Sequence, residues 1–159
     1  MFYTIDSITP VCRKLHAVGR KLVLATGFFD LLHQEHINFL RKAKAVGDTL
    51  IVAIESDERA KITKGEGRPV ESQTIRCQKV SAYADYVIAL PSDFNNFEAY
   101  DSLMFAVKPE IYAVSSHTSH QKTKDFLSEK YGGHLQVVHE FNPSISTTQI
   151  INNGIMSPQ

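Results

Sequence analysis

The sequence predicts a doubly wound α/β fold built on a parallel sheet. Five apolar runs of strand length alternate along the chain with segments in which apolar residues recur at helical spacing. The runs are apolar almost throughout, which is typical of strands that are covered on both faces. Right-handed crossovers between such strands place helices on both faces of the sheet.

These patterns assign the elements in chain order. Thr9 and Pro10 predict the start of a short opening helix ending near Gly19, because threonine caps helices and proline suits the first helical position. Strands are expected at about 21–26, 49–54, 85–90, 111–114 and 134–138. Helices are expected at about 34–46, 71–83, 95–107 and 118–131, with a last one from about 146. Segment 55–70 is predicted as a basic, glycine-bearing loop.

Length and charge limit the function classes. With 159 residues and 43% hydrophobic content, we expect a single domain over 1–159 whose residues 155–159 form a flexible tail. The 17 basic and 17 acidic side chains cancel, so no overall field attracts nucleic acid or an anionic membrane, and neither is expected as a partner. Any affinity for phosphate must therefore come from local placement.

The cysteines and the N-terminus point to a cytoplasmic protein. Cys12 and Cys77 are far apart in sequence and have no metal-ligand spacing, so we expect free thiols. The first ten residues lack a basic start followed by an apolar run, and no stretch has the length of a membrane span.

The segment 26–36 carries the clearest chemical signal. It places His33 and His36 three residues apart, where an apolar strand turns into a helix. The first turn of a helix presents free backbone N–H groups and the positive end of the dipole. Two imidazoles can add donors aimed at the same anion, so the turn is predicted to bind phosphate at the carboxyl edge of the sheet.

This segment resembles the signature of the cytidylyltransferase-like nucleotidyltransferases. In that family a Gly-x-Phe-Asp-x-x-His-x-Gly-His run follows the first strand of a Rossmann-like sheet, and the matching residues here are Gly27, Phe29, Asp30, His33 and His36. The resemblance implies that His33 and His36 act in catalysis. It also implies that the turn of Thr26, Gly27, Phe28 and Phe29 binds the nucleotide.

The basic segment after the second strand extends the resemblance. Lys64-Gly65-Glu66-Gly67-Arg68-Pro69-Val70 is similar to a segment of the sugar-phosphate adenylyltransferases that make ADP-heptose. The resemblance implies a catalytic Lys64 acting on the departing pyrophosphate, with Arg68 and Arg76 as nucleotide ligands. The alternatives are a solvated loop and, for Arg76, an exposed helix arginine.

A second phosphate corner is expected near the C-terminus. Ser146, Thr147 and Thr148 resemble the Ser-Thr-Thr that opens the family's last helix, which implies that all three bind the nucleotide. Hydroxyls and free N–H groups at a helix start favour an anion, although the same residues can serve as a plain N-cap.

Two departures from the family pattern argue against an active nucleotidyltransferase of the heptose type. Glu35 occupies the place of the motif glycine, and 113–120 lacks the lysine and aspartate of the heptose branch. Either Glu35 turns sideways to pair with a cation such as Lys64 or with a metal, or the carboxylate repels phosphate and catalysis is lost.

Seven histidines also raise a metal hypothesis. His33/His36 and His117/His120 could clamp zinc if the two pairs converge, but structural zinc prefers cysteine, so no protein metal site is expected. His16, His134 and His139 are interpreted as structural, and Asp30 as bonding the backbone of its turn.

The reaction that the resemblance implies is nucleotidyl transfer from an NTP, either ATP or CTP, to a phosphorylated sugar or polyol with release of pyrophosphate. Heptose-type adenylyl transfer is the first choice and glycerol-phosphate-type cytidylyl transfer the second. Mg²⁺ is the expected cofactor, bridging the NTP phosphates. A homodimer is left open. The alternative of another class is a catalytically impaired nucleotide-binding or regulatory protein.

Overall fold

The computed structural model describes residues 2–140 and 147–152, with the side chains of Thr148 and Gln149 left out. The strands are β1 (Leu22–Gly27), β2 (Thr49–Ile54), β3 (Tyr86–Ala89), β4 (Ile111–Ser115) and β5 (His134–His139). The helices are α1 (Ile5–Ala17), α2 (Gln34–Ala45), α3 (Asp57–Lys64), α4 (Gln73–Val80), α5 (Phe97–Val107), α6 (Gln121–Lys130) and α7 (Thr147–Asn152). The flexible tail expected at 155–159 lies outside the described residues.

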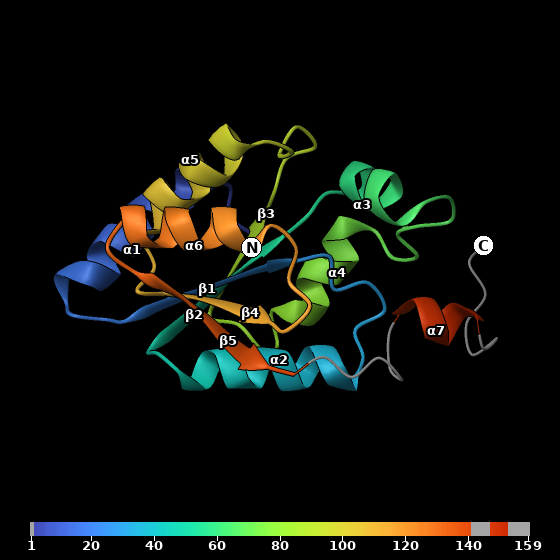
Figure 1. The fold of residues 1–159 in the computed structure, drawn as a ribbon, viewed down its shortest axis with the longest axis horizontal. Helices are drawn as coiled ribbons and strands as arrows, with labels where there is room; N and C mark the ends of the chain where they lie inside the picture. The colour runs from blue at the N-terminus through green and yellow to red at the C-terminus, as the bar shows by residue number, and fades with distance from the viewer. Residues whose placement is uncertain (1, 141–146, 153–159) are drawn as a thin grey trace.

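The strands form one parallel sheet in the order β3-β2-β1-β4-β5. Helices α1, α5 and α6 cover one face, and α2 and α4 cover the other (Figure 1). This confirms the predicted doubly wound α/β fold, Rossmann-like with five parallel strands. All six residues of β2 are buried, as expected for a strand covered on both faces. From β1 the chain first adds β2 and β3 on one side and then β4 and β5 on the other. A crevice at the carboxyl ends of β1 and β4 follows from this topology.

The opening helix begins earlier than predicted. Thr4 is the N-cap, and its hydroxyl and that of Ser7 form a reciprocal capping box. Ile5, Ile8 and Cys12 then pack into the core at helical spacing, so the apolar face continues upstream of Pro10. Pro10 lies inside the helix rather than at its first position, and the prediction that the helix starts there was wrong.

The larger correction concerns segment 55–70, which was predicted as a loop. Residues 57–64 form α3, capped by the Ser56 hydroxyl, which accepts from the backbone N–H of Arg59 at 3.1 Å. Gly65 ends the helix with a φ of 98°, a value that favours glycine. The sequence carries the usual helix signals: a serine cap, acidic Asp57 and Glu58 in the first turn, and a terminal glycine.

Both cysteines are buried free thiols, as predicted. Within the part of the chain that the structure describes, no helix has the length and apolar character needed to cross a bilayer.

Candidate active site

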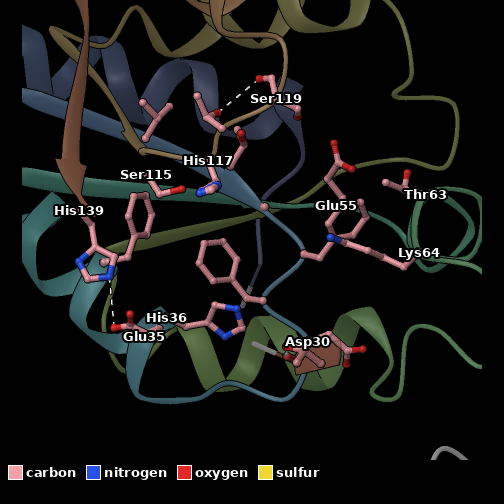
Figure 2. A pocket seen from close by; sticks show the side chains of 18 of the residues that line it. Asp30, Glu35, His36, Glu55, Thr63, Lys64, Ser115, His117, Ser119 and His139 are labelled. Atoms are coloured by element: carbon pink, nitrogen blue, oxygen red, sulfur yellow. Dashed lines mark hydrogen bonds and ion pairs between the residues drawn. The ribbon is translucent and has the colours of Figure 1, made fainter. Parts of the chain in front are cut away.

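A cavity of about 630 Å³ lies at the carboxyl edge of the sheet. It is lined by residues from the turn after β1, the first turn of α2, α3, the end of β4 and the following loop. Figure 2 shows His36 and Asp30 on one side of this pocket, His117 and Ser119 on the opposite side, Glu55 and Lys64 on a third, and Glu35 with His139 on the fourth. The predicted site residues in its lining are Thr26, Gly27, Phe28, Phe29, His33, His36, Lys64, Arg68 and Thr147.

The turn after β1 is fixed by Asp30. Its carboxylate is 2% exposed and accepts from Arg68 Nε at 3.0 Å, from the backbone N–H of Val70 at 2.8 Å and from that of Glu71 at 3.0 Å. Asp30 therefore bonds the backbone of the segment after α3, and not that of its own turn as predicted, and ties the two segments together. A Cβ at Gly27 would lie 2.9 Å from the ring of Phe29, so only glycine lets this ring fold back over the strand end.

The two histidines occupy the start of α2, as predicted. His33 is the N-cap and His36 is the third helical residue, and their rings stack with centroids 3.8 Å apart. The backbone N–H of His33 points to Nδ1 of His36 at 3.4 Å. This bond leaves the His36 proton on Nε2, where it is free to be donated.

Both imidazoles are neutral near pH 7. Burial lowers the pKa of His36 to about 3, with further lowering from His33. Burial also lowers the pKa of His33. The buried Nδ1 of His33 has no hydrogen-bond partner among residues 2–140 and 147–152. The pair thus presents neutral, preoriented hydrogen-bonding groups, which suits the recognition of an anion.

Cationic side chains also line the pocket. Lys64 lies on the last turn of α3, with Nζ 5.5 Å from the centre of the Phe28 ring. The Arg68 side chain is only 10% exposed and is held against Asp30. Arg59, which sequence reasoning missed, also lines the pocket from α3.

Arg76 is not part of the pocket lining, which corrects the prediction that it binds phosphate. It is fully buried on α4 and donates to the carbonyl of Glu71 at 3.0 Å, to that of Phe28 at 2.7 Å and to Asp57 Oδ1 at 2.7 Å. These bonds join three segments behind the pocket. Arg76 is therefore neither a phosphate ligand of this pocket nor an exposed helix arginine. It is a structural cross-link.

Glu35 turns sideways, as one of the two hypotheses expected, but it contacts His139 and Asn38 rather than Lys64. Glu35 Oε2 lies 3.3 Å from Nε2 of the buried His139 at the end of β5. Nδ1 of His139 lies 3.0 Å from Lys42 Nζ. Because an ammonium only donates, Nδ1 accepts from Lys42. Nε2 is buried and makes no hydrogen bond within the described residues, so the carboxylate faces the ring without being hydrogen-bonded to it.

A second group of polar residues was missed by sequence reasoning. Glu55, 6% exposed at the end of β2, accepts from the hydroxyl of Tyr100 at 3.4 Å, and burial raises the pKa of its carboxyl. Lys124 of α6 is 7% exposed, and its Nζ donates to the Thr118 hydroxyl at 2.7 Å. No local pattern marks these residues, because their burial depends on how α5 and α6 pack over the sheet.

The C-terminal phosphate corner is described only in part. Thr147, 7% exposed, donates its hydroxyl to the carbonyl of Asp30 at 2.6 Å and so holds α7 against the turn after β1. Ser146 lies outside the described residues, as does the side chain of Thr148.

Metal binding by histidine clusters has no support in the geometry. Within 2–140 and 147–152, no three or more His, Cys, Asp or Glu side chains are arranged to hold a metal ion. His117 and His120 line the pocket but do not form a ligand set with His33 and His36. His16 pairs with Glu110 at 3.2 Å, and His134 is exposed at the start of β5.

Known proteins similar in sequence point to one family. Residues 24–153 match the family model described as cytidylyltransferase-like. The chain is 30% identical over 152 residues to the bifunctional protein HldE of Desulfatibacillum aliphaticivorans, covering 94% of this chain and 30% of that protein. It is 39% identical over 108 residues to the protein of the same name from Wolinella succinogenes, covering 67% of this chain and 22% of that protein. The chain therefore spans less than a third of the length of these curated relatives.

Solved structures agree on the fold. A lipopolysaccharide core biosynthesis protein from Thermoplasma volcanium superposes with a TM-score of 0.61 at 24% identity, covering 78% of this chain and 98% of that one. A pantoate-beta-alanine ligase from Francisella tularensis superposes with a TM-score of 0.63 at 14% identity, covering 96% of this chain and 76% of that one. With the family model matching most of the sequence, the chain belongs to the cytidylyltransferase-like family of nucleotidyltransferases.

Proposed function

We propose that this protein transfers a nucleotidyl group from an NTP to a phosphorylated sugar or polyol and releases pyrophosphate. The observation that carries the proposal is the stacked, neutral pair of His33 and His36 at the start of α2, facing a cavity that Lys64 and Arg68 also line. This arrangement offers donors and fixed charges to a chain of phosphates.

The chemistry requires little of the protein. An oxygen of the acceptor phosphate forms a bond to the α-phosphorus in line, and the bond from that phosphorus to the oxygen bridging to the β-phosphate breaks. The electron pair leaves with pyrophosphate. No general base is needed, because a phosphate monoester is already an anion near neutral pH, so catalysis consists of positioning and charge stabilisation.

The histidines would bind the oxygens around the reacting phosphorus. His36 offers its Nε2–H while its Nδ1 is occupied by the backbone of its own helix turn. Burial lowers its pKa to about 3, so the ring is neutral when the phosphates arrive. A donor already held in place needs no reorganisation as charge develops.

Lys64 and Arg68 would hold the departing pyrophosphate. Positive charge accelerates the reaction only where it acts more strongly in the transition state than on bound NTP, which is the case at the oxygen that gains charge as the bond breaks. Arg68 is fixed by Asp30, whereas Lys64 is exposed and rests near the Phe28 ring. At the other side of the turn, Ser146, Thr147 and Thr148 would contact the nucleotide phosphates around the start of α7.

Mg²⁺ is expected to enter with the nucleotide and to neutralise phosphate charge. The residues fit an ion held mainly by phosphate oxygens, since both Asp30 oxygens already accept hydrogen bonds and no three-ligand group occurs in the described part of the chain.

The base and the acceptor follow from resemblance. The segment 64–70 is similar to heptose-type adenylyltransferases, which makes ATP and a heptose phosphate the first candidates. The loop after β4, Ser116–His120, departs from that branch, so cytidylyl transfer to glycerol phosphate is the second candidate. The impaired alternative is disfavoured, because Glu35 contacts His139 instead of standing uncompensated beside the histidines.

The test is pyrophosphate release with ATP and CTP, each combined with heptose 1-phosphate or glycerol 3-phosphate. His36→Ala should lower turnover by about 10²- to 10³-fold, as expected for losing one preorganised donor. Its melting temperature should fall by only a few degrees, since a cap contributes about 1 kcal/mol.

His134→Ala, at an exposed histidine of β5, is the matched control and should behave as wild type. Wild-type turnover by His36→Ala would remove the proposed site. Absence of pyrophosphate from every combination would leave the impaired, nucleotide-binding alternative.

A further inference from the structure

A smaller cavity of about 140 Å³ adjoins the main pocket. Four side chains line both cavities, and they are Arg59, Tyr100, His120 and Lys124. The remaining lining of this side pocket is Asn95, Asn96, Phe97 and Thr123, from the start of α5 and from α6. The proposed function assigns no role to it.

Arg59 presents a donor without an acceptor on this shared wall. Its Nε is buried and has no hydrogen-bond partner within 2–140 and 147–152. A buried N–H left unpaired is unfavourable by roughly 1–3 kcal/mol, and each such group in a native structure calls for an explanation. An oxygen of a bound ligand would supply the missing acceptor.

Lys124 stands on the same wall in an unusual setting for an ammonium group. It is 7% exposed, donates to Thr118 and has its Nζ 5.7 Å from the centre of the Tyr112 ring. Burial lowers its pKa to about 8, opposed by Glu55. Within the described residues, no carboxylate oxygen lies within 4.0 Å of the charged nitrogens of either Arg59 or Lys124. The charge of the buried Glu55 acts on both cations, but it forms an ion pair with neither, so the unpaired Arg59 Nε still lacks an acceptor that an anionic ligand can supply.

The side pocket itself is suited to hydroxyl groups. Asn95, Asn96 and Thr123 offer amide and hydroxyl groups, and Asn96 is held by its Oδ1, which accepts from the backbone N–H of Ala99 at 2.9 Å. The amide nitrogen of Asn96 remains available as a donor. At roughly 30 Å³ per water, the volume equals about five waters, enough for an open chain of about three carbons with its hydroxyls.

We propose that this side pocket is the acceptor subsite for a phosphomonoester with a short, open-chain polyol arm. The phosphate lies on the main-pocket side against Arg59 and Lys124, and the hydroxyls of the arm bond to Asn95, Asn96 and Thr123. The proposal rests on the proposed function and, between its two acceptors, favours glycerol phosphate over a heptose phosphate. It also accounts for the unpaired nitrogen of Arg59.

The test measures binding separately from turnover. Calorimetry in the presence of a non-hydrolysable ATP or CTP analogue compares two probes of equal length, glycerol 3-phosphate and propyl phosphate, which lacks the hydroxyls. Wild type should bind glycerol 3-phosphate about tenfold or more tightly than propyl phosphate.

Two variants separate the contact with the phosphate from the contacts with the hydroxyl groups. Arg59→Ala should weaken both probes by about tenfold or more, because both lose a charged partner of the phosphate. Thr123→Leu fills the side pocket and should abolish the preference for glycerol 3-phosphate while sparing propyl phosphate. Neither variant should change nucleotide affinity by more than about twofold, a change of about 0.4 kcal/mol.

The matched controls lie on the same helices outside both cavities. Lys61→Ala on α3 removes one positive charge, and Gln121→Leu on α6 adds the same side chain; both should bind the probes as wild type does.

The outcomes separate this inference from the proposed function. Pyrophosphate release with unaltered probe binding in Arg59→Ala and Thr123→Leu would overturn the subsite and leave nucleotidyl transfer intact. A selective loss of nucleotide affinity in Arg59→Ala would assign that arginine to the triphosphate and would also overturn it. Probe binding that depends on Arg59 and Thr123 in a protein that releases no pyrophosphate would support the subsite and refute the activity.

Discussion

Position 35 shows how one residue can depart from a motif without opposing its chemistry. A carboxylate in the second position of a helix is favoured by the dipole but would compete with a bound phosphate. Here the side chain of Glu35 is 13% exposed and faces His139, which in turn contacts Lys42. The carboxylate thus faces His139, although Glu35 also lines the pocket and its charge still acts on His33.

This contact predicts that Glu35→Gly weakens nucleotide binding. Removing the carboxylate leaves the buried His139 without the carboxylate that it faces, and loosens the first turn of α2. In a double-mutant cycle with His139→Asn, we expect a coupling of about 0.5–3 kcal/mol in unfolding free energy. Thermal unfolding and calorimetric titration of ATP measure the two effects.

Glu98→Gly is the control, because Glu98 is exposed at the same helical position of α5. It should lose only the helix propensity term, about 1 kcal/mol or less. Tighter ATP binding by Glu35→Gly than by wild type would mean that the carboxylate repels the triphosphate and that the site is impaired.

His36 also predicts a pH dependence of stability. Its pKa is lowered from 6.5 to about 3 in the folded protein. Between these values the unfolded chain binds a proton that the folded chain does not, so stability is complete above pH 6.5 and is lost as the pH falls. At pH 5 the loss from this group is about 2 kcal/mol.

Replacing His36 by asparagine should therefore flatten the acid side of the stability curve. Denaturant unfolding from pH 7 to pH 4 measures the slope in wild type, in His36→Asn and in the exposed control His134→Asn. Equal slopes in all three proteins would show that His36 is not held neutral by burial.

At the scale of the elements, α3 accounts for most of what the sequence analysis missed. The segment 57–64 has few apolar residues, so the periodic pattern that identified the other helices is weak there. Its caps were nevertheless visible in Ser56 and Gly65. Because 57–64 is helical, Arg59, Thr63 and Lys64 come to the same pocket wall, which a mobile loop would not define.

Arg76 connects α4 to α3 and to the turn after β1, and this role predicts a stability effect. Arg76→Ala leaves Asp57 and the carbonyls of Phe28 and Glu71 without their donor. The unfolding free energy should fall by about 1–3 kcal/mol, because the carbonyls lose their donor, whereas the Asp57 side chain is 44% exposed and can be solvated. Denaturant unfolding measures it, with the exposed Arg13→Ala on α1 as control.

The outcome distinguishes the two roles of Arg76. A loss of stability in Arg76→Ala without a raised KM for NTP supports the structural role. A protein as stable as wild type, with a raised KM for NTP, would restore the prediction that Arg76 binds phosphate.

At the scale of the whole molecule, the sheet was predictable and the complete pocket was not. Each of the five strands lies within two residues of its expected range. For β1, β2 and β4 the reason is burial on both faces, which leaves a continuous apolar run that is visible locally. The histidine turn was likewise local, as one strand and one helix contain it. Glu55, Arg59 and Lys124 come from three elements that only the packed fold brings together.

The central claim is that chemistry occurs at the α-phosphorus, and the fate of labelled phosphate tests it most directly. Wild-type protein would be incubated with the preferred acceptor and with NTP labelled at either the α or the γ position. Transfer at the α-phosphorus predicts α label in a nucleotide-diphosphate conjugate and γ label in pyrophosphate, with both products strongly reduced in His36→Ala. Gamma label appearing in the acceptor or in inorganic phosphate, with no α-labelled conjugate, would contradict the account.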